Sequence, residues 1–189
     1  MSAPFRVLGI DPGSRVTGFG VVEAHGSRLR HVAHGVLRVP GDLALELRLA
    51  ELFHGLSGVL ARWTPDAVAV EGVFACRNAR SALVLGHARG VALLAAAQGG
   101  QPVFEYAPAL VKRAVGAGGA ASKDAVAKQM RAFLGLAGNL RADATDALAV
   151  AVCHLHRARV VTLLPERPRA RRRPLGWPRL SRAVYGAPR

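Results

Sequence analysis

The chain has 189 residues, half of them apolar, which is enough for one domain with a full core and argues against general disorder. Lys and Arg number 26 against 12 Asp and Glu, so the net charge is +14 and nucleic acid or another anionic surface is the expected partner class. Half of this excess lies in a Pro/Arg-rich stretch at the C-terminal end. We therefore predict a folded domain over residues 1–164 and a disordered basic tail over residues 165–189.

The compartment is predicted from what the sequence lacks. Cys76 and Cys153 are isolated and have no CxxC spacing, so they indicate neither a disulfide framework nor a zinc site and fit a reducing compartment. No apolar run approaches the roughly 18 residues that span a membrane, and the first seven residues do not resemble a signal peptide. We expect a soluble, cytoplasmic protein that makes no membrane contact.

The first twenty-odd residues predict a β-hairpin. Residues 5–10 and 17–23 are strand-like, and the turn between them contains adjacent proline and glycine. Ser14 and Thr17 would also suit a phosphate-binding loop, but we favour a role in stabilising the hairpin. Asp11 ends the first strand, where it could hold a cation at the edge of the sheet or bond its own backbone as a turn aspartate. The hairpin alone does not decide between these two roles.

The rest of the chain alternates between strands and helices. Further strands are expected over residues 29–39, 67–70 and 102–106. Helices are expected over residues 43–63, 78–98, 108–115, 123–136 and 141–159, with Asp42 and Ser122 as candidate N-caps. Three strands, a helix and then alternating elements predict an α/β fold with a five-stranded mixed sheet and helices on both faces.

The helix predicted over residues 78–98 is apolar almost all round and rich in small residues. A helix of this kind is buried on more than one side, either within the core or against a second subunit. We therefore expect this helix at or near a dimer interface.

Four carboxylates suggest chemistry at the sheet edge. Asp11 and Glu71 each end a strand, and ligands of open α/β sheets gather where such ends meet. Asp143 and Asp146 lie three residues apart and so share one side of the last helix, although acidic residues at a helix N-terminus are also favoured by the helix dipole. Carboxylates gathered at one buried edge need a counter-charge. Mg²⁺ or Mn²⁺ suits such oxygen ligands, and two such ions can promote phosphodiester cleavage.

Five sequence motifs, in order and with consistent spacing, resemble the RuvC family of Holliday-junction resolvases over residues 5–160. The motifs are GIDPGSRVTGFGVV, VEGVF, NARSALVLGHARGVA, VFEYAP followed by VKRAV, and ADATDALAVA. The resemblance implies a ribonuclease H-like nuclease domain and a crossover junction endodeoxyribonuclease. It also implies a homodimer that makes paired symmetric nicks in a four-way DNA junction during recombination and repair. The RuvAB branch-migration complex is the protein partner that it implies.

The resemblance also implies roles for individual residues. The metal-binding catalytic carboxylates would be Asp11, Glu71, Asp143 and Asp146, with two Mg²⁺ or Mn²⁺ ions per site. Phe74 would lie near the unpaired bases of the junction, although its spacing fits a core residue equally well. Lys112 and Lys123 match basic positions near the scissile phosphate or along the DNA backbone.

Two other functions compete with a nuclease on the basis of the sequence. An actin-like or sugar-kinase ATPase shares the strand-one Asp-x-Gly turn, but it needs a second domain and an adenosine pocket, for which 189 residues leave no room. A non-catalytic junction-binding protein is disfavoured by the four carboxylates, because acidic groups weaken DNA binding unless a metal ion lies between them and the phosphates.

Overall fold

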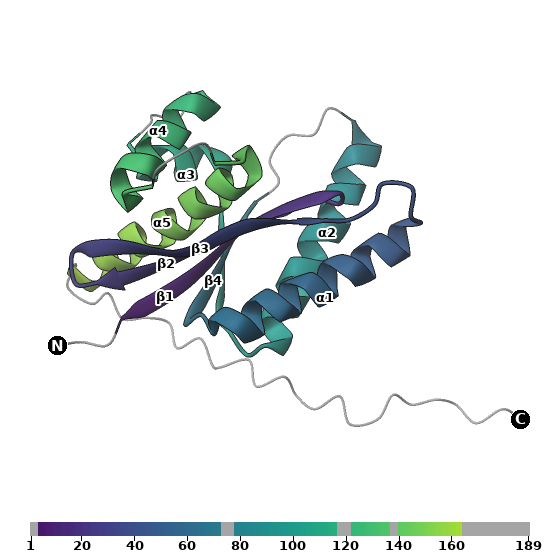
Figure 1. The fold of residues 1–189 in the computed structure, drawn as a ribbon, viewed down its shortest axis with the longest axis horizontal. Coiled ribbons are helices and arrows are strands. Elements are labelled where there is room, and N and C mark those ends of the chain that lie inside the picture. Colours follow the sequence, from purple (N-terminus) through teal and green to yellow (C-terminus); the bar gives the residue numbers. More distant parts are fainter. Residues whose placement is uncertain (1–3, 73–77, 117–121, 137–139, 164–189) are drawn as a thin grey trace, which may run out of the picture.

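The computed structural model describes residues 4–72, 78–116, 122–136 and 140–163, and in these ranges it contains one five-stranded sheet (Figure 1). The strands are β1 (Phe5–Asp11), β2 (Val16–His25), β3 (Arg28–Arg38), β4 (Ala67–Glu71) and β5 (Val103–Tyr106). Their order across the sheet is β3-β2-β1-β4-β5. The first three strands form an antiparallel meander, and β4 and β5 continue the sheet parallel to β1.

Five helices cover the two faces of the sheet. On one side lie α1 (Leu45–Trp63) and α2 (Ala79–Gln98), and on the other lie α3 (Pro108–Ala114), α4 (Lys123–Leu134) and α5 (Ala142–Leu163) (Figure 1). The predicted five-stranded mixed sheet with helices on both faces is therefore confirmed. The predicted tail, residues 165–189, lies outside the described residues, so the domain boundary stays a prediction.

Two hydrophobic cores follow from the alternation of side chains along the strands. Val7 and Val22 face the α3–α5 side, where they join Leu148 and Val152 of α5. Leu8 and its neighbours of alternate register face α1 and α2. Because every central strand buries side chains on both faces, the ends of these strands are the places where polar groups can reach a cavity.

The ends of the helices differ from the predictions at several points. Asn78 caps α2, and its side chain accepts a hydrogen bond from Ser81 N at 2.8 Å. Ser122 caps α4 as predicted. Asp42 does not cap α1, because that helix begins two residues later than a cap at this position requires and has Ala44 at its N-cap without a side-chain hydrogen bond. Helix α4 stops early because Gly135 adopts a left-handed φ of 62°.

Helix α2 differs from the expectation that no apolar segment of the chain is long enough to span a membrane. Within the described ranges it is long and apolar enough, by length and composition, to cross a membrane. A core helix of a soluble protein meets the same criterion, and the buried Ala88, Ala92 and Ala95 pack this helix on the rest of the fold. Its opposite side carries Leu83 and Leu94, which are 65% and 50% exposed in the single chain.

A buried carboxylate that the sequence analysis did not single out ties the meander together. Glu23 is 1% exposed and accepts hydrogen bonds from Arg6 at 2.5 Å and from Arg30 at 2.5 Å, with His25 at 3.2 Å. Burial alone would raise the pKa of the Glu23 carboxyl, but the hydrogen bonds from Arg30, Arg6 and His25 outweigh burial and hold the pKa at about 2. This residue therefore has a structural role on the meander.

Helix α5 approaches the sheet closely because glycines of β1 and β2 lie beneath it. A Cβ atom at Gly9 would lie 2.0 Å from the Ala147 carbonyl oxygen, and one at Gly18 would lie 1.9 Å from the Asp143 carbonyl oxygen. Both contacts are to helix backbone, which cannot rotate away as a side chain could. The missing side chains thus set the depth at which the acidic start of α5 sits on the sheet.

We predict that Gly18→Ala destabilises the protein by at least about 1–3 kcal/mol, the usual cost of overpacking a core, because the added methyl must push α5 away. Urea unfolding followed by circular dichroism measures this change. Gly58→Ala is the matched control, since nothing lies within 4 Å of a Cβ at that exposed position of α1. The control should gain about 0.5–1 kcal/mol from helix propensity, and equal stabilities of the two variants would contradict the packing argument.

Candidate active site

Two carboxylates meet at one edge of the sheet because their strands are parallel neighbours. Asp11 is the last residue of β1 and Glu71 is the last residue of β4, and the preceding residues Ile10 and Val70 are paired in register. The turn after Asp11 is held by Thr17, whose hydroxyl donates to the Gly13 carbonyl at 2.7 Å and accepts from Gly13 N at 3.1 Å. The predicted hairpin role of Thr17 is thus confirmed.

Helix α5 adds a third carboxylate. Asp11, Glu71 and Asp146 line one cavity of about 290 Å³ together with Lys112 from α3. The remaining walls are apolar or backbone and come from Pro108, Val111, Val126 and Ala149. The cavity therefore opens on the face of the sheet that α3, α4 and α5 cover.

Asp143 occupies a different position from the other three carboxylates. It lies one helical turn before Asp146 on α5, does not line the cavity, and approaches Arg141 Nη2 at 4.0 Å. Its charge still reaches the cavity, since it helps to raise the pKa of Asp11. Of the four predicted carboxylates, the structure brings three to the cavity wall and leaves the fourth beside it.

The electrostatics of the cavity disfavour a full set of negative charges. The pKa of the Asp11 carboxyl is raised to about 8. Burial is the largest cause, followed by the charge of Glu71, a hydrogen bond shared with Glu71, and the charges of Asp146 and Asp143. A proton or a cation is therefore needed at this edge of the sheet to balance the acidic groups near neutral pH.

The donor set suits a hard divalent cation, although its members are not gathered around one point. Carboxylate oxygens are the ligands that Mg²⁺ and Mn²⁺ prefer. In the part of the chain that the structure describes, no three Asp, Glu, His or Cys side chains form a group that could hold one ion. The chemistry of the site fits a divalent cation, and the side chains would have to draw together to enclose it.

The other predicted site residues have different outcomes. Lys112 lies in the cavity wall beside the carboxylates. Lys123 is the first residue of α4, and its side chain lies outside the described residues. Phe74 also lies outside them, in the segment 73–77 that follows β4. Val111 and Val126 also line the wall, and their helical apolar spacing in the sequence indicated only core positions.

Comparison with solved structures identifies the fold. The structure of "T. thermophilus RuvC in complex with Holliday junction substrate" matches with a TM-score of 0.79 and 36% identity, over 84% of this chain and 97% of that one. The yeast mitochondrial Holliday junction resolvase Ydc2 matches with a TM-score of 0.59 at 14% identity, over 80% of this chain and 78% of that one, which supports the fold alone. The chain thus has a ribonuclease H-like fold, with a carboxylate-lined cavity at the sheet edge.

Comparison of sequences gives the family. The family model described as "Crossover junction endodeoxyribonuclease RuvC" matches residues 7–154. The protein of that name from Myxococcus xanthus is 65% identical over 156 residues, which is 82% of each chain. The chain belongs to the RuvC family of crossover junction endodeoxyribonucleases, the Holliday-junction resolvases. The predicted nuclease activity is confirmed, and the ATPase and non-catalytic alternatives are set aside.

We predict that the stability of the metal-free protein falls as the pH rises. Because the folded-state pKa of Asp11, about 8, lies above the ordinary value of 3.8, the folded state retains a proton that the unfolded state has released, and this advantage is lost between about pH 4 and pH 8. In chelator, the unfolding free energy of the wild type should drop relative to Asp11→Asn by at least about 1.4 kcal/mol, the equivalent of one pKa unit.

Denaturant titrations of both proteins from about pH 5 to about pH 9 measure this difference. Asp11→Asn is the internal reference because it keeps the shape of the side chain and removes its ionisation. A difference between the two proteins that does not change with pH would contradict the raised pKa.

Proposed function

We propose that Asp11, Glu71, Asp143 and Asp146 hold divalent cations, two Mg²⁺ or Mn²⁺ ions per site, for the hydrolysis of phosphodiester bonds in a four-way DNA junction. The observation that carries this proposal is the shared cavity of Asp11, Glu71, Asp146 and Lys112. Nucleases of this family are metal-dependent. When bound, such ions activate a water molecule and stabilise the leaving oxygen.

The residues of the chain prepare the site in several ways. The Asp11 carboxyl has to lose the proton that its raised pKa retains, and an approaching cation favours that loss. Lys112 brings a positive charge to the same wall, where it can pair with an oxygen of the phosphate. Asp143, which lies beside the cavity and near Arg141, would act from its margin.

Binding of the junction is proposed from charge and from a relative. The T. thermophilus protein was solved with a Holliday junction substrate, and the present chain carries a net charge of +14. We propose the same substrate here, with Lys123 on the DNA backbone, Phe74 at the unpaired bases, and residues 165–189 as an accessory that contacts phosphates. We also propose that the protein acts in the cytoplasm, together with the RuvAB branch-migration complex.

A homodimer would supply the two active sites that paired symmetric nicks require. The outer side of α2 is the candidate interface, because Leu83 and Leu94 are exposed there while the inner side is already packed. Gly86 and Gly90 lie on this exposed side, and small residues let two helix backbones approach each other closely. The predicted burial of α2 on more than one side would thus be met only in the dimer.

We predict that Asp11→Asn, Glu71→Gln and Asp146→Asn each lower junction cleavage by at least about a hundredfold, the scale for removing one electrostatic stabiliser from an active site. Binding of the junction should be retained, because the basic surface is unchanged. Asp143→Asn should be the mildest of the four substitutions, since this residue lies outside the cavity wall.

Single-turnover cleavage of a synthetic junction, with binding measured in chelator, tests these variants. Glu51→Gln is the control, because it removes one exposed carboxylate of α1 far from the cavity. If Asp11→Asn or Glu71→Gln nicked at a near-normal rate at ordinary metal concentration, that residue would have no place among the ligands.

We predict that the protein sediments as a dimer at micromolar concentration without DNA, and that Leu83→Arg combined with Leu94→Arg converts it to a monomer. Burying a guanidinium in an apolar helix interface is costly, whereas the same residue on a solvated face costs little. Leu47→Arg on α1 is the control, since Leu47 is also exposed. A wild-type monomer, or a dimer that survives both substitutions, would rule out this interface.

A further inference from the structure

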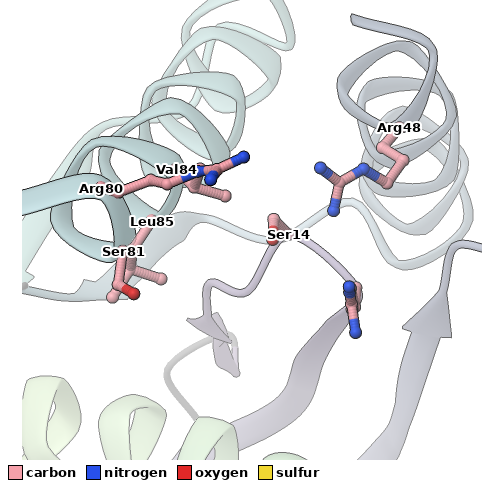
Figure 2. A pocket seen from close by; sticks show the side chains of 7 residues that line it. Ser14, Arg48, Arg80, Ser81, Val84 and Leu85 are labelled. Carbon is pink, nitrogen blue, oxygen red and sulfur yellow. The ribbon is translucent and has the colours of Figure 1, made fainter. Parts of the chain in front are cut away.

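A second cavity lies on the opposite side of the sheet from the carboxylates. It has a volume of about 400 Å³ and lies where the turn after β1 meets the first turns of α1 and α2 (Figure 2). Its wall consists of Ser14, Arg15, Arg48, Arg80, Ser81, Val84 and Leu85. It thus collects three arginines and two hydroxyls, and none of the described residues that line it is acidic.

The three arginines of this cavity have no acidic partner among the described residues. Arg6 and Arg30 pair with Glu23, whereas no ion pair within the described residues involves Arg15, Arg48 or Arg80. The Nε atom of Arg48 is buried and has no hydrogen-bond partner among the described residues. A buried donor without an acceptor costs about 1–3 kcal/mol, so this position favours an added acceptor.

Two of the arginines face each other across the cavity (Figure 2). Figure 2 shows the side chains of Arg48 and Arg80 pointing toward each other from α1 and α2, with Ser14 between them in this view. Two cations that face each other repel unless an anion lies between them. Guanidinium groups pair with phosphate oxygens through two parallel hydrogen bonds, and a serine hydroxyl can donate a third, so a tetrahedral phosphate suits this arrangement better than a planar carboxylate.

The position of the cavity relates it to the active site. Ser14 belongs to the same turn as Asp11, and α2 begins after the segment that follows Glu71. The two cavities therefore share the end of the sheet at which β1 and β4 finish, but the carboxylates face α3–α5 and the arginines face α1 and α2. A DNA strand that leaves the cutting site over this edge would bring another of its phosphates to the arginines.

We propose that Arg48, Arg80 and Ser14 form a pocket for a backbone phosphodiester of the junction, distinct from the phosphate that is cut. The inference rests on the proposed junction binding. The bound phosphate would fix the path of a strand beside the active site, so Arg48 and Arg80 are positioning residues. Phosphate contacts of this kind set the register of a complex and carry no base sequence.

The test is a binding experiment in chelator, where no cleavage occurs. A series of synthetic junctions is made, and each carries a single neutral methylphosphonate at a different backbone position. For the wild type, one position other than the cut site on each symmetric half should weaken binding by about tenfold, the equivalent of one charge-assisted hydrogen bond. The double variant Arg48→Gln/Arg80→Gln should bind the unmodified junction about tenfold more weakly and should lose its sensitivity at that same position.

Two further readouts follow from the same contact. Each lost phosphate contact should lower the log–log salt slope of binding by about 0.9. Arg62→Gln is the matched control, because it removes the same charge from the far end of α1 outside the cavity, and it should keep the sensitive position. If the double variant fails to fold, Arg48→Lys keeps the charge but not the paired hydrogen bonds, and it should weaken the interference at that position.

Several outcomes would overturn the pocket. The sensitive position could persist unchanged in the folded double variant, or Arg62→Gln could lose it equally. Millimolar inorganic phosphate could stabilise the wild type but not the double variant while junction binding stays equal, which would indicate a site for a free anion. If the wild type did not bind the junction at all, that result would instead contradict the proposed function, so the two failures are distinguishable.

Discussion

The close contact between α5 and the glycines of β1 and β2 is the constraint on which the site depends. A carbonyl oxygen of α5 occupies the space that a side chain at Gly18 would fill, and the residue that carries this oxygen is Asp143. The first turn of α5, which carries Asp143, is therefore the part of the helix that packs most closely on the sheet. With the helix at this depth, Asp146 reaches the cavity that Asp11 and Glu71 line from the strand ends.

The sheet separates two groups of opposite charge at one of its ends. On the α3–α5 face, burial and the neighbouring carboxylates raise the pKa of Asp11 to about 8, and among the described residues one lysine, Lys112, lines their cavity. On the α1–α2 face, arginines line a cavity whose described wall contains no acidic residue. Each group is unfavourable when it is left alone. Under the proposed function, cations would compensate the acidic cavity and phosphates of the DNA would compensate the basic one.

Charge elsewhere in the fold is handled differently. Glu23 is buried within the core, but hydrogen bonds from Arg30, Arg6 and His25 lower its pKa to about 2, so it carries its charge at neutral pH without needing an external ion. The contrast with Asp11 separates a structural carboxylate from a candidate ligand. One is already satisfied by the chain, and the other requires a proton or a metal.

The sequence by itself determined the elements, their mixed α/β arrangement, and the positions of Asp11 and Glu71 at strand ends, because period and turn chemistry act locally along the chain. It also placed Asp143 and Asp146 on one side of a helix, but only the tertiary structure separated the one that lines the cavity from the one beside it.

The placement of Arg48 and Arg80 on one cavity wall was likewise decided by tertiary structure, since the two residues lie on different helices and no spacing along the chain relates them. Contacts between distant segments depend on how deeply helices pack on the sheet. That depth is set here by the absence of side chains at Gly9 and Gly18. The periodicity of apolar residues in the sequence does not reveal which glycines a helix packs against.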